Sequence, residues 1–82
     1  MTGVGRKLFA DNMRALRGVR GMSQEDLAGA AQIDRSYVSL IENTHYSISV
    51  DQIEKIADAL DVDIREMFDP DIARHEKQTA HP

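Results

Sequence analysis

Residues 24–43 read QEDLAGAAQIDRSYVSLIEN, and this stretch predicts two short helices joined by a tight turn. In the first half, the apolar residues that recur on one helical face are Leu27, Ala28 and Ala31. Ser23 stands before them as an N-cap, with Asp26 placed to reach back to it. Only Gln32 and Ile33 separate the two halves. The helices must therefore meet at a steep angle, as in a helix-turn-helix unit.

The second half of the stretch has one apolar face and one polar face. Asp34 is its predicted N-cap, and Val38 with Ile41 forms the inward stripe. At about 100° per residue, the opposite arc carries only polar side chains. They are Arg35, Ser36, Ser39 and Asn43. An amphipathic helix with a polar outer face is expected here.

That outer face carries groups that suit the edges of base pairs in the DNA major groove. A guanidinium suits guanine, hydroxyls suit either base partner, and apolar atoms suit the thymine methyl group. The predicted base-contacting residues are Arg35, Ser36, Ser39 and, at the border of the face, Leu40. Tyr37 lies at the edge of the inner face, where its ring can pack while its hydroxyl reaches a base or a phosphate. The face favours sequence-specific binding of double-stranded DNA.

A polar loop, THYSI at residues 44–48, follows on the same side. Short polar groups and the start of the next helix are ordinary phosphate ligands. We expect phosphate contacts from Asn43 and Ser47. His45 and Tyr46 are candidates for the same role, although they could equally be exposed loop residues.

Three further helices are expected around this unit. From Arg6 to about Val19, apolar residues at i, i+4 and i+7 predict an amphipathic helix; they are Phe9, Met13 and Leu16. Ser49 followed by Gln52 is a capping-box signature for another helix. Its inward stripe consists of Ile53, Ile56, Ala57 and Leu60. A last short helix begins after Asp63 and stops at Asp69-Pro70.

The predicted domain spans residues 6–69. Residues 1–5, with two glycines, are expected to be a flexible lead-in. Residues 70–82 are polar and are expected to be either a frayed helical extension or a disordered tail.

Three segments resemble one known family. SQEDLA (23–28), DRSYVSLIEN (34–43) and ISVDQIEKIADALDV (48–62) are similar to the lambda-repressor-like, Cro and XRE helix-turn-helix regulators, over roughly residues 6–68. Within that family, DRSYVS looks most like the controller proteins of restriction-modification systems. The resemblance implies an all-α, five-helix lambda-repressor-like fold, with the base-contacting set named above.

The resemblance also implies roles for residues outside the polar face. Gln24 would touch a phosphate, and Arg17 would form an ion pair with Glu42. Gln32 departs from the family pattern, because the turn often carries glycine with positive φ, and another residue there costs some strain.

The family commonly dimerises through the end of the domain. The apolar side chains available there are Ile64, Met67 and Phe68. A terminal helix cannot bury several large apolar groups on one small core, so a dimer contact is expected. The alternative is that these residues close the core of the monomer, and we expect part of each.

Composition excludes several classes of protein. Eighty-two residues with 41% hydrophobic content allow one helical domain but no enclosed catalytic cleft, so an enzyme is not expected. There is no cysteine, and the three histidines lack ligand spacing, so neither a metal nor another cofactor is expected. No small-molecule ligand is evident. No apolar run could span a membrane and no signal peptide is evident, so a cytoplasmic location is expected.

The net charge of -4 is unevenly distributed. Residues 1–47 carry six basic and five acidic side chains, a net +1, whereas residues 48–82 carry four and nine, a net -5. An acidic end turned away from DNA would weaken non-specific binding and favour a selective binder. Acidic residues also keep a domain soluble, and both explanations can hold.

These patterns predict a homodimeric transcriptional regulator that binds a pseudo-palindromic operator, in keeping with control of restriction-modification genes. The competing interpretation is a protein-binding module of the same fold, such as an antitoxin or a repressor partner. The acidic C-terminal half mildly favours that alternative. Against it stands the polar helix face, which would have no use without a groove to enter.

Overall fold

The structure is a computed structural model that describes residues 3–44 and 46–73. Its elements are α1 (Val4–Val19), α2 (Gln24–Ala31), α3 (Arg35–Thr44), α4 (Val50–Ala59) and the 3-10 helix η1 (Ile64–Phe68). No strand occurs in the described ranges. The prediction of an all-α fold with five helices is therefore confirmed.

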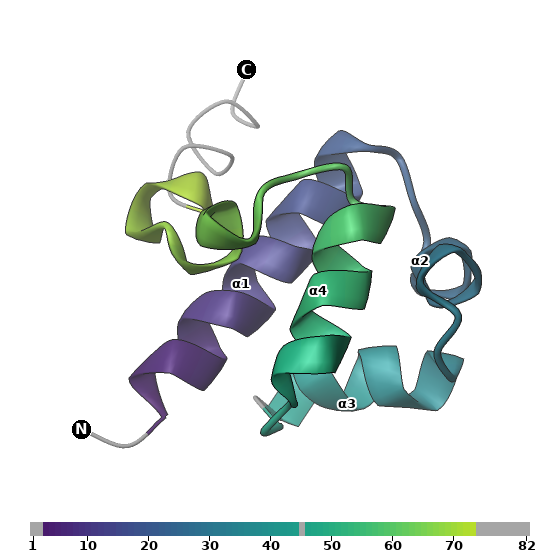
Figure 1. Cartoon of the computed structure of the whole chain (residues 1–82), viewed down its shortest axis with the longest axis horizontal. Coiled ribbons are helices and arrows are strands. Elements are labelled where there is room, and N and C mark those ends of the chain that lie inside the picture. Colours follow the sequence, from purple (N-terminus) through teal and green to yellow (C-terminus); the bar gives the residue numbers. More distant parts are fainter. Residues whose placement is uncertain (1–2, 45, 74–82) are drawn as a thin grey trace.

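The helices surround one apolar core, and α3 lies at one edge of it. α3 packs against both α1 and α2, whereas η1 packs against α1 and α4. Figure 1 shows α3 along the lower edge of the molecule and η1 on the opposite side, above the middle of α1. The largest buried side chains come from all five elements: Met13, Leu27, Val38, Ile41, Ile56, Leu60 and Met67. This arrangement leaves the far side of α3 open to solvent.

Side-chain caps start α2, α4 and η1 as the sequence indicates. Ser23 Oγ accepts a hydrogen bond from the Asp26 backbone N–H at 2.9 Å, and the Asp26 carboxylate accepts from the Ser23 N–H at 3.0 Å. Asp63 caps η1 in a similar way. Ser49 Oγ accepts from the Gln52 N–H at 3.2 Å, but the full capping box expected there is wrong. The Gln52 side-chain oxygen is buried instead of turning back to the helix start, and it has no hydrogen-bond partner among the described residues.

The helical part of the chain extends beyond both ends of the predicted domain, residues 6–69, and at the C-terminal end this agrees with the helical extension that the sequence left open against a disordered tail. Helix α1 begins at Val4, because Gly3 adopts a left-handed φ of 91° and its carbonyl accepts the Lys7 N–H. Residues 4 and 5 are therefore helical and not a flexible lead-in. Beyond Asp69, residues 70–73 form another helical turn, and Ile72 packs on the core. Proline is favourable in a first helical turn because its missing N–H has no helical partner there.

A buried asparagine that sequence reasoning missed ties this last segment to α1. The Asn12 side-chain nitrogen lies 3.3, 3.0 and 2.8 Å from the carbonyl oxygens of Glu66, Met67 and Asp69. Its Oδ1 accepts from the Ala73 backbone N–H at 3.2 Å. Asn12 is fully buried, so water cannot replace these bonds. One amide thus satisfies backbone groups at the end of η1 and in the turn after it.

We expect Asn12→Leu to lower the free energy of unfolding by about 1–3 kcal/mol, because it leaves buried carbonyl oxygens without donors. Urea denaturation measures the loss, and amide hydrogen exchange should quicken most in residues 64–73. The neighbouring Asp11→Ala, which breaks only an exposed ion pair with Lys7, is the control and should cost well under 1 kcal/mol. Equal stability of Asn12→Leu and the wild type would contradict the role of the amide.

Candidate nucleic-acid interface

The turn between α2 and α3 forms without glycine. Gln32 takes the left-handed conformation, with φ 58° and ψ 45°. This positive φ is expected at the position where the family often carries glycine. The Ile33 N–H donates to the Ala28 carbonyl at 3.0 Å, and the Ile33 side chain packs against the core. These contacts hold the two helices at a fixed angle and offset the strain at Gln32.

Asp34 fixes the start of α3 and draws Ser36 into its cap. The Asp34 carboxylate accepts from the Ser36 backbone N–H at 2.9 Å and from the Ser36 hydroxyl at 2.8 Å. These two bonds, the backbone one first, hold the pKa of Asp34 below its ordinary value. Because the hydroxyl proton is already donated to Asp34, Ser36 offers mainly lone pairs to an outside partner.

The outer face of α3 matches the predicted arc. Val38 and Ile41 are buried, whereas Arg35, Ser36 and Asn43 are exposed. Leu40 is 40% exposed at the border of the face. Within the described part of the chain, the Arg35 guanidinium makes no hydrogen bond or ion pair. An unpaired guanidinium at the start of an open helix face can donate five N–H groups to an acceptor outside the protein.

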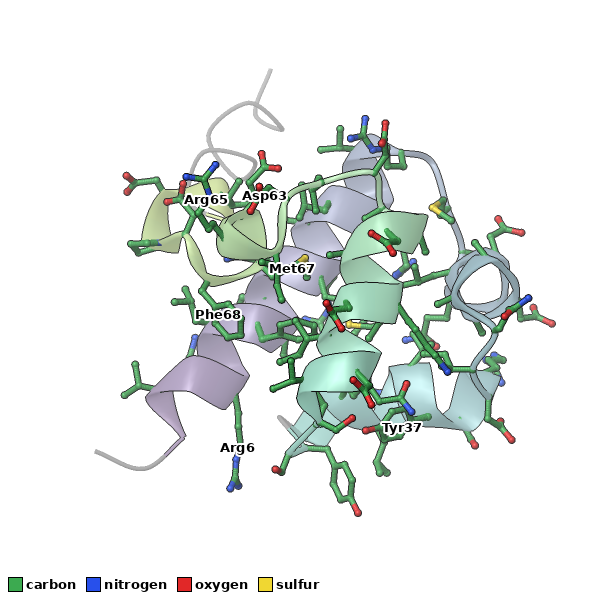
Figure 2. All side chains as sticks on the ribbon, in the orientation of Figure 1. Arg6, Tyr37, Asp63, Arg65, Met67 and Phe68 are labelled. Atoms are coloured by element: carbon green, nitrogen blue, oxygen red, sulfur yellow. The ribbon has the colours of Figure 1, made fainter. Side chains whose placement is uncertain are left out.

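Two tyrosines connect α3 to the segment that follows it. The Tyr37 and Tyr46 rings meet edge to face, with centroids 6.1 Å apart and an interplanar angle of 83°. Burial, and to a smaller extent the neighbouring Tyr46, raises the pKa of Tyr37 above its ordinary value. The Tyr37 hydroxyl is therefore a neutral donor at physiological pH. Figure 2 shows Tyr37 on α3 at the lower edge of the molecule.

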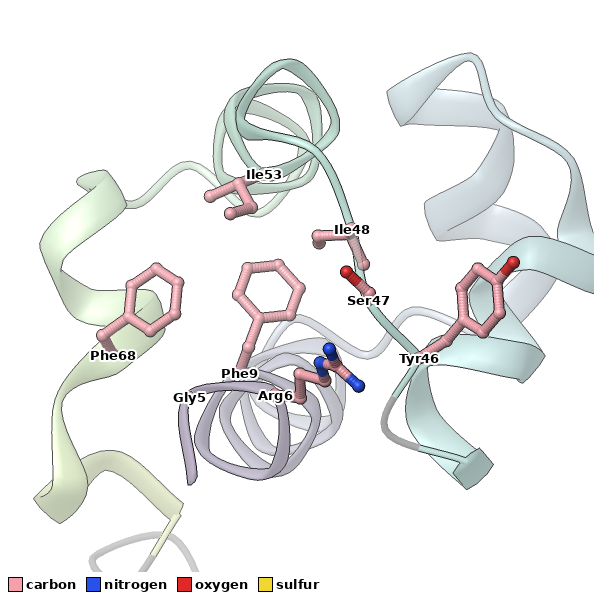
Figure 3. A pocket seen from close by; sticks show the side chains of 8 residues that line it. All are labelled: Gly5, Arg6, Phe9, Tyr46, Ser47, Ile48, Ile53 and Phe68. Atoms are coloured by element: carbon pink, nitrogen blue, oxygen red, sulfur yellow. The ribbon is translucent and has the colours of Figure 1, made fainter. Parts of the chain in front are cut away.

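Of the predicted loop residues, Tyr46 and Ser47 are exposed beside α3. His45 lies outside the described residues. In Figure 3, Tyr46 and Ser47 lie on one side of a small pocket of about 120 Å³, with Arg6 from the start of α1 on the same side. The predicted phosphate ligands Tyr46 and Ser47 therefore lie close to the C-terminal end of α3.

A nearly buried carboxylate joins the three helices around this face. Glu42 on α3 is only 2% exposed. Arg17 on α1 binds it in a bidentate manner, through Nε and Nη2, at 2.9 Å each. Gln24, the first residue of α2, donates its side-chain N–H to the same carboxylate at 3.1 Å. The structure therefore contains the Arg17–Glu42 ion pair and leaves Gln24 one further amide N–H for a phosphate.

Two further arginines, one in α1 and one at its C-cap, bind backbone carbonyl groups. Arg20 donates to the carbonyls of Leu60 and Asp61 at 2.8 and 3.2 Å. Asp61 has a left-handed φ of 58°, so Arg20 secures a strained turn after α4. Arg14 donates to the Glu42 carbonyl at 2.9 Å, near the end of α3.

The three predicted dimer residues divide into two groups. Ile64 and Phe68 are each 38% exposed, but Met67 is fully buried. Figure 2 shows Met67 turned toward α1 and α4. Met67 as a dimer contact is therefore wrong, because a fully buried side chain presents no surface to a second molecule. Phe68 also packs against Phe9, with ring centroids 5.5 Å apart.

A helix-turn-helix family model, HTH_3, matches residues 13–67, which include the whole α2–turn–α3 unit. The chain belongs to this helix-turn-helix family. It is a DNA-binding transcription regulator, and α3 is the second helix of the motif.

Curated relatives of this helix-turn-helix protein include two bacterial regulators. It is 46% identical over 57 residues to a hypothetical transcription factor of Neisseria meningitidis, matching 70% of this chain but only 54% of that protein, about half its length. It is 40% identical over 70 residues to the control protein C.BamHI of Bacillus amyloliquefaciens, covering 84% of this chain and 86% of that one.

Solved structures agree with this assignment. The restriction-modification controller protein C.AhdI from Aeromonas hydrophila is 41% identical, with a TM-score of 0.73, covering 77% of this chain and 96% of C.AhdI. C.Esp1396I bound to a 25-base-pair operator site is 27% identical, with a TM-score of 0.74, over 90% and 95% of the two chains.

The described helix-turn-helix domain shows no sign of two other kinds of site. None of its helices is long and apolar enough to cross a membrane. Residues 3–44 and 46–73 contain no group of three or more histidine, aspartate or glutamate side chains arranged to hold a metal ion.

We expect Arg17→Ala to lower the free energy of unfolding by about 1–3 kcal/mol, because it leaves the buried Glu42 carboxylate poorly paired. Thermal and urea denaturation measure the change. Lys7→Ala on the same helix removes an ion pair with an exposed partner and should cost less than about 1 kcal/mol. An unchanged midpoint for Arg17→Ala would rule out the structural role of the pair.

Proposed function

We propose that this helix-turn-helix protein binds a pseudo-palindromic operator as a homodimer and regulates restriction-modification genes. Two copies of α3 would enter successive major grooves on one side of the duplex, with half-sites about 34–36 Å apart or a multiple of that distance. The observation that carries this proposal is the exposed, unpaired Arg35 at the start of a helix held from behind by Glu42. The operator complex of C.Esp1396I and the relation to C.BamHI support it.

The proposed base contacts come from the outer face of α3. Arg35 is placed to donate two hydrogen bonds to guanine, and Leu40 to contact a thymine methyl group. Ser36 suits an amino group, because its own proton is donated to Asp34. Ser39 and Tyr37 complete the set, with the Tyr37 hydroxyl able to reach either a base or a phosphate.

The proposed phosphate contacts lie around that face. Gln24 stands at the start of α2, and Asn43, Tyr46 and Ser47 stand where α3 ends and the chain leaves it. His45, outside the described residues, stays a prediction of the sequence. Phosphate contacts set the position of the protein on the duplex, whereas the base contacts select the sequence.

Ile64 and Phe68 are the proposed subunit contact, since both expose apolar surface on η1. We propose that protein concentration controls operator occupancy through this dimerisation, because only the dimer holds both recognition helices together. The place of action would be the cytoplasm, where a bacterial operator is found.

We expect Arg35→Ala to weaken binding of the selected operator by about 1–3 kcal/mol and to relax the preference at one base pair of each half-site. Titration of selected and scrambled duplexes at the same salt concentration measures both effects. Lys55→Ala, which removes one exposed positive charge from α4, is the control and should leave the base preference unchanged. Equal losses on both duplexes would make Arg35 a phosphate ligand.

We expect Ile64→Lys to shift the protein toward monomer and to raise the concentration needed for half-occupancy of the operator by about tenfold or more. Analytical ultracentrifugation and operator titration measure the two effects. Val19→Lys replaces an apolar residue with 55% exposure at the end of α1 and adds the same charge, so it serves as the control. A dimer that persists in Ile64→Lys would place the subunit contact elsewhere.

A further inference from the structure

A chain of three polar side chains links α1 to the outer face of the recognition helix. Arg14 Nη2 lies 3.4 Å from Asn43 Oδ1, and Asn43 Nδ2 donates to Ser39 Oγ at 3.0 Å. Asn43 and Ser39 are one helical turn apart on α3, on the arc that carries Arg35. This series of hydrogen bonds therefore begins on α1, which supports α3, and ends at the Ser39 hydroxyl on the outer face of α3.

Arg14 is held in place by more than its contact with Asn43. The same Nη2 donates to the Glu42 backbone carbonyl at 2.9 Å, and Nε lies 3.8 Å from the buried Glu42 carboxylate. A cation also suits the C-terminal end of α3, where unpaired carbonyl groups gather. The guanidinium is thus fixed beside Asn43 by groups that do not depend on DNA.

The chemistry of the guanidinium fixes the direction of every bond in this chain. Arginine has donors and no acceptor, so the atom of the Asn43 amide that faces Arg14 must be the oxygen. The amide nitrogen then faces Ser39, whose oxygen must accept. One lone pair of Ser39 is thereby occupied, which leaves its O–H to be donated and a single lone pair to accept.

We propose that Arg14 is a positioning residue that, through Asn43, makes Ser39 a hydrogen-bond donor toward the DNA. This inference rests on the proposed placement of α3 in the major groove. A donor matches guanine N7 and O6, adenine N7 and thymine O4, whereas cytosine presents only its amino group there. Ser39 then favours these acceptors over cytosine, whose amino group can bind only the one remaining lone pair of Ser39, and the Arg14–Asn43 pair is the source of that preference.

Asn43→Asp tests the direction of the hydrogen bond between residue 43 and Ser39. A carboxylate can still accept from Arg14, but its second oxygen must accept from the Ser39 O–H, which reverses Ser39 and turns its lone pairs outward. Selection of duplexes from a random pool is carried out for the wild type, Asn43→Asp, Asn43→Ala and Ser39→Ala, and the enriched sites are compared. Ser39→Ala identifies the base pair that Ser39 reads, because preference is lost there.

At that base pair, Asn43→Asp is expected to raise the affinity for cytosine relative to the wild-type base by about tenfold, and Asn43→Ala to relax the preference without reversing it. The added negative charge weakens binding to every duplex alike, so it cancels in the relative affinity. Unchanged relative affinities in Asn43→Asp at the base pair identified by Ser39→Ala would overturn the proposal.

Arg14→Met tests the first link of the chain. It should relax the preference at the same base pair, whereas Arg14→Lys, which keeps a donor, should retain it. A residue that only touched a phosphate would weaken all duplexes equally and leave the preference intact, which would remove Arg14 from the mechanism. Urea denaturation of each variant separates this effect from a loss of stability.

The selection also separates this inference from the proposed function. A wild-type protein that enriches no two-fold repeated site would contradict the operator proposal itself. A wild type that enriches such a site, with variants that leave its Ser39 position unchanged, would overturn the polarity mechanism alone.

Discussion

The bidentate ion pair between Arg17 and the buried Glu42 is the interaction on which the recognition surface depends. Hydrophobic burial brings α1, α2 and α3 together but is not directional, so it leaves some freedom in the rotation of each helix. A planar guanidinium that meets a carboxylate with two bonds of 2.9 Å removes much of that freedom. The Gln24 amide donates a hydrogen bond to the same carboxylate and so ties α2 to α3. The outer side chains of α3 are therefore presented in one orientation before DNA arrives.

Local patterns were sufficient to predict the helices and much of the polar face. Ser23, Asp34 and Asp63 cap their helices through contacts with residues two or three positions away, which a short window of sequence reveals. The face containing Arg35 followed from the helical period alone. The resemblance to known regulators supplied the Arg17–Glu42 pair, which spans 25 positions and has no local signal.

The features that the sequence did not reveal depend on contacts between residues far apart in the chain, or on which of two neighbouring apolar side chains faces the core. Asn12 bonds to groups 54 to 61 positions away, and nothing near it marks a buried asparagine. Met67 and Phe68 look equivalent as apolar neighbours, and only the turn of η1 decides which faces the core. Arg14 and Arg20 bind backbone carbonyl groups. Every residue has such an acceptor, so the sequence does not indicate which one an arginine will bind. The helical turn at 70–73 depends on the same Asn12.

The position of Met67 has a consequence for how the regulator responds to heat. Met67 anchors η1 in the hydrophobic core, whereas Ile64 and Phe68 of the same helix are partly exposed. The relative position of Ile64 and Phe68 therefore depends on the packing of the core around Met67. Loosening that centre would disturb the apolar surface that we propose as the subunit contact. Under the proposed function, warming that loosens the core would therefore weaken subunit pairing and operator binding together, because a single subunit carries only one copy of α3.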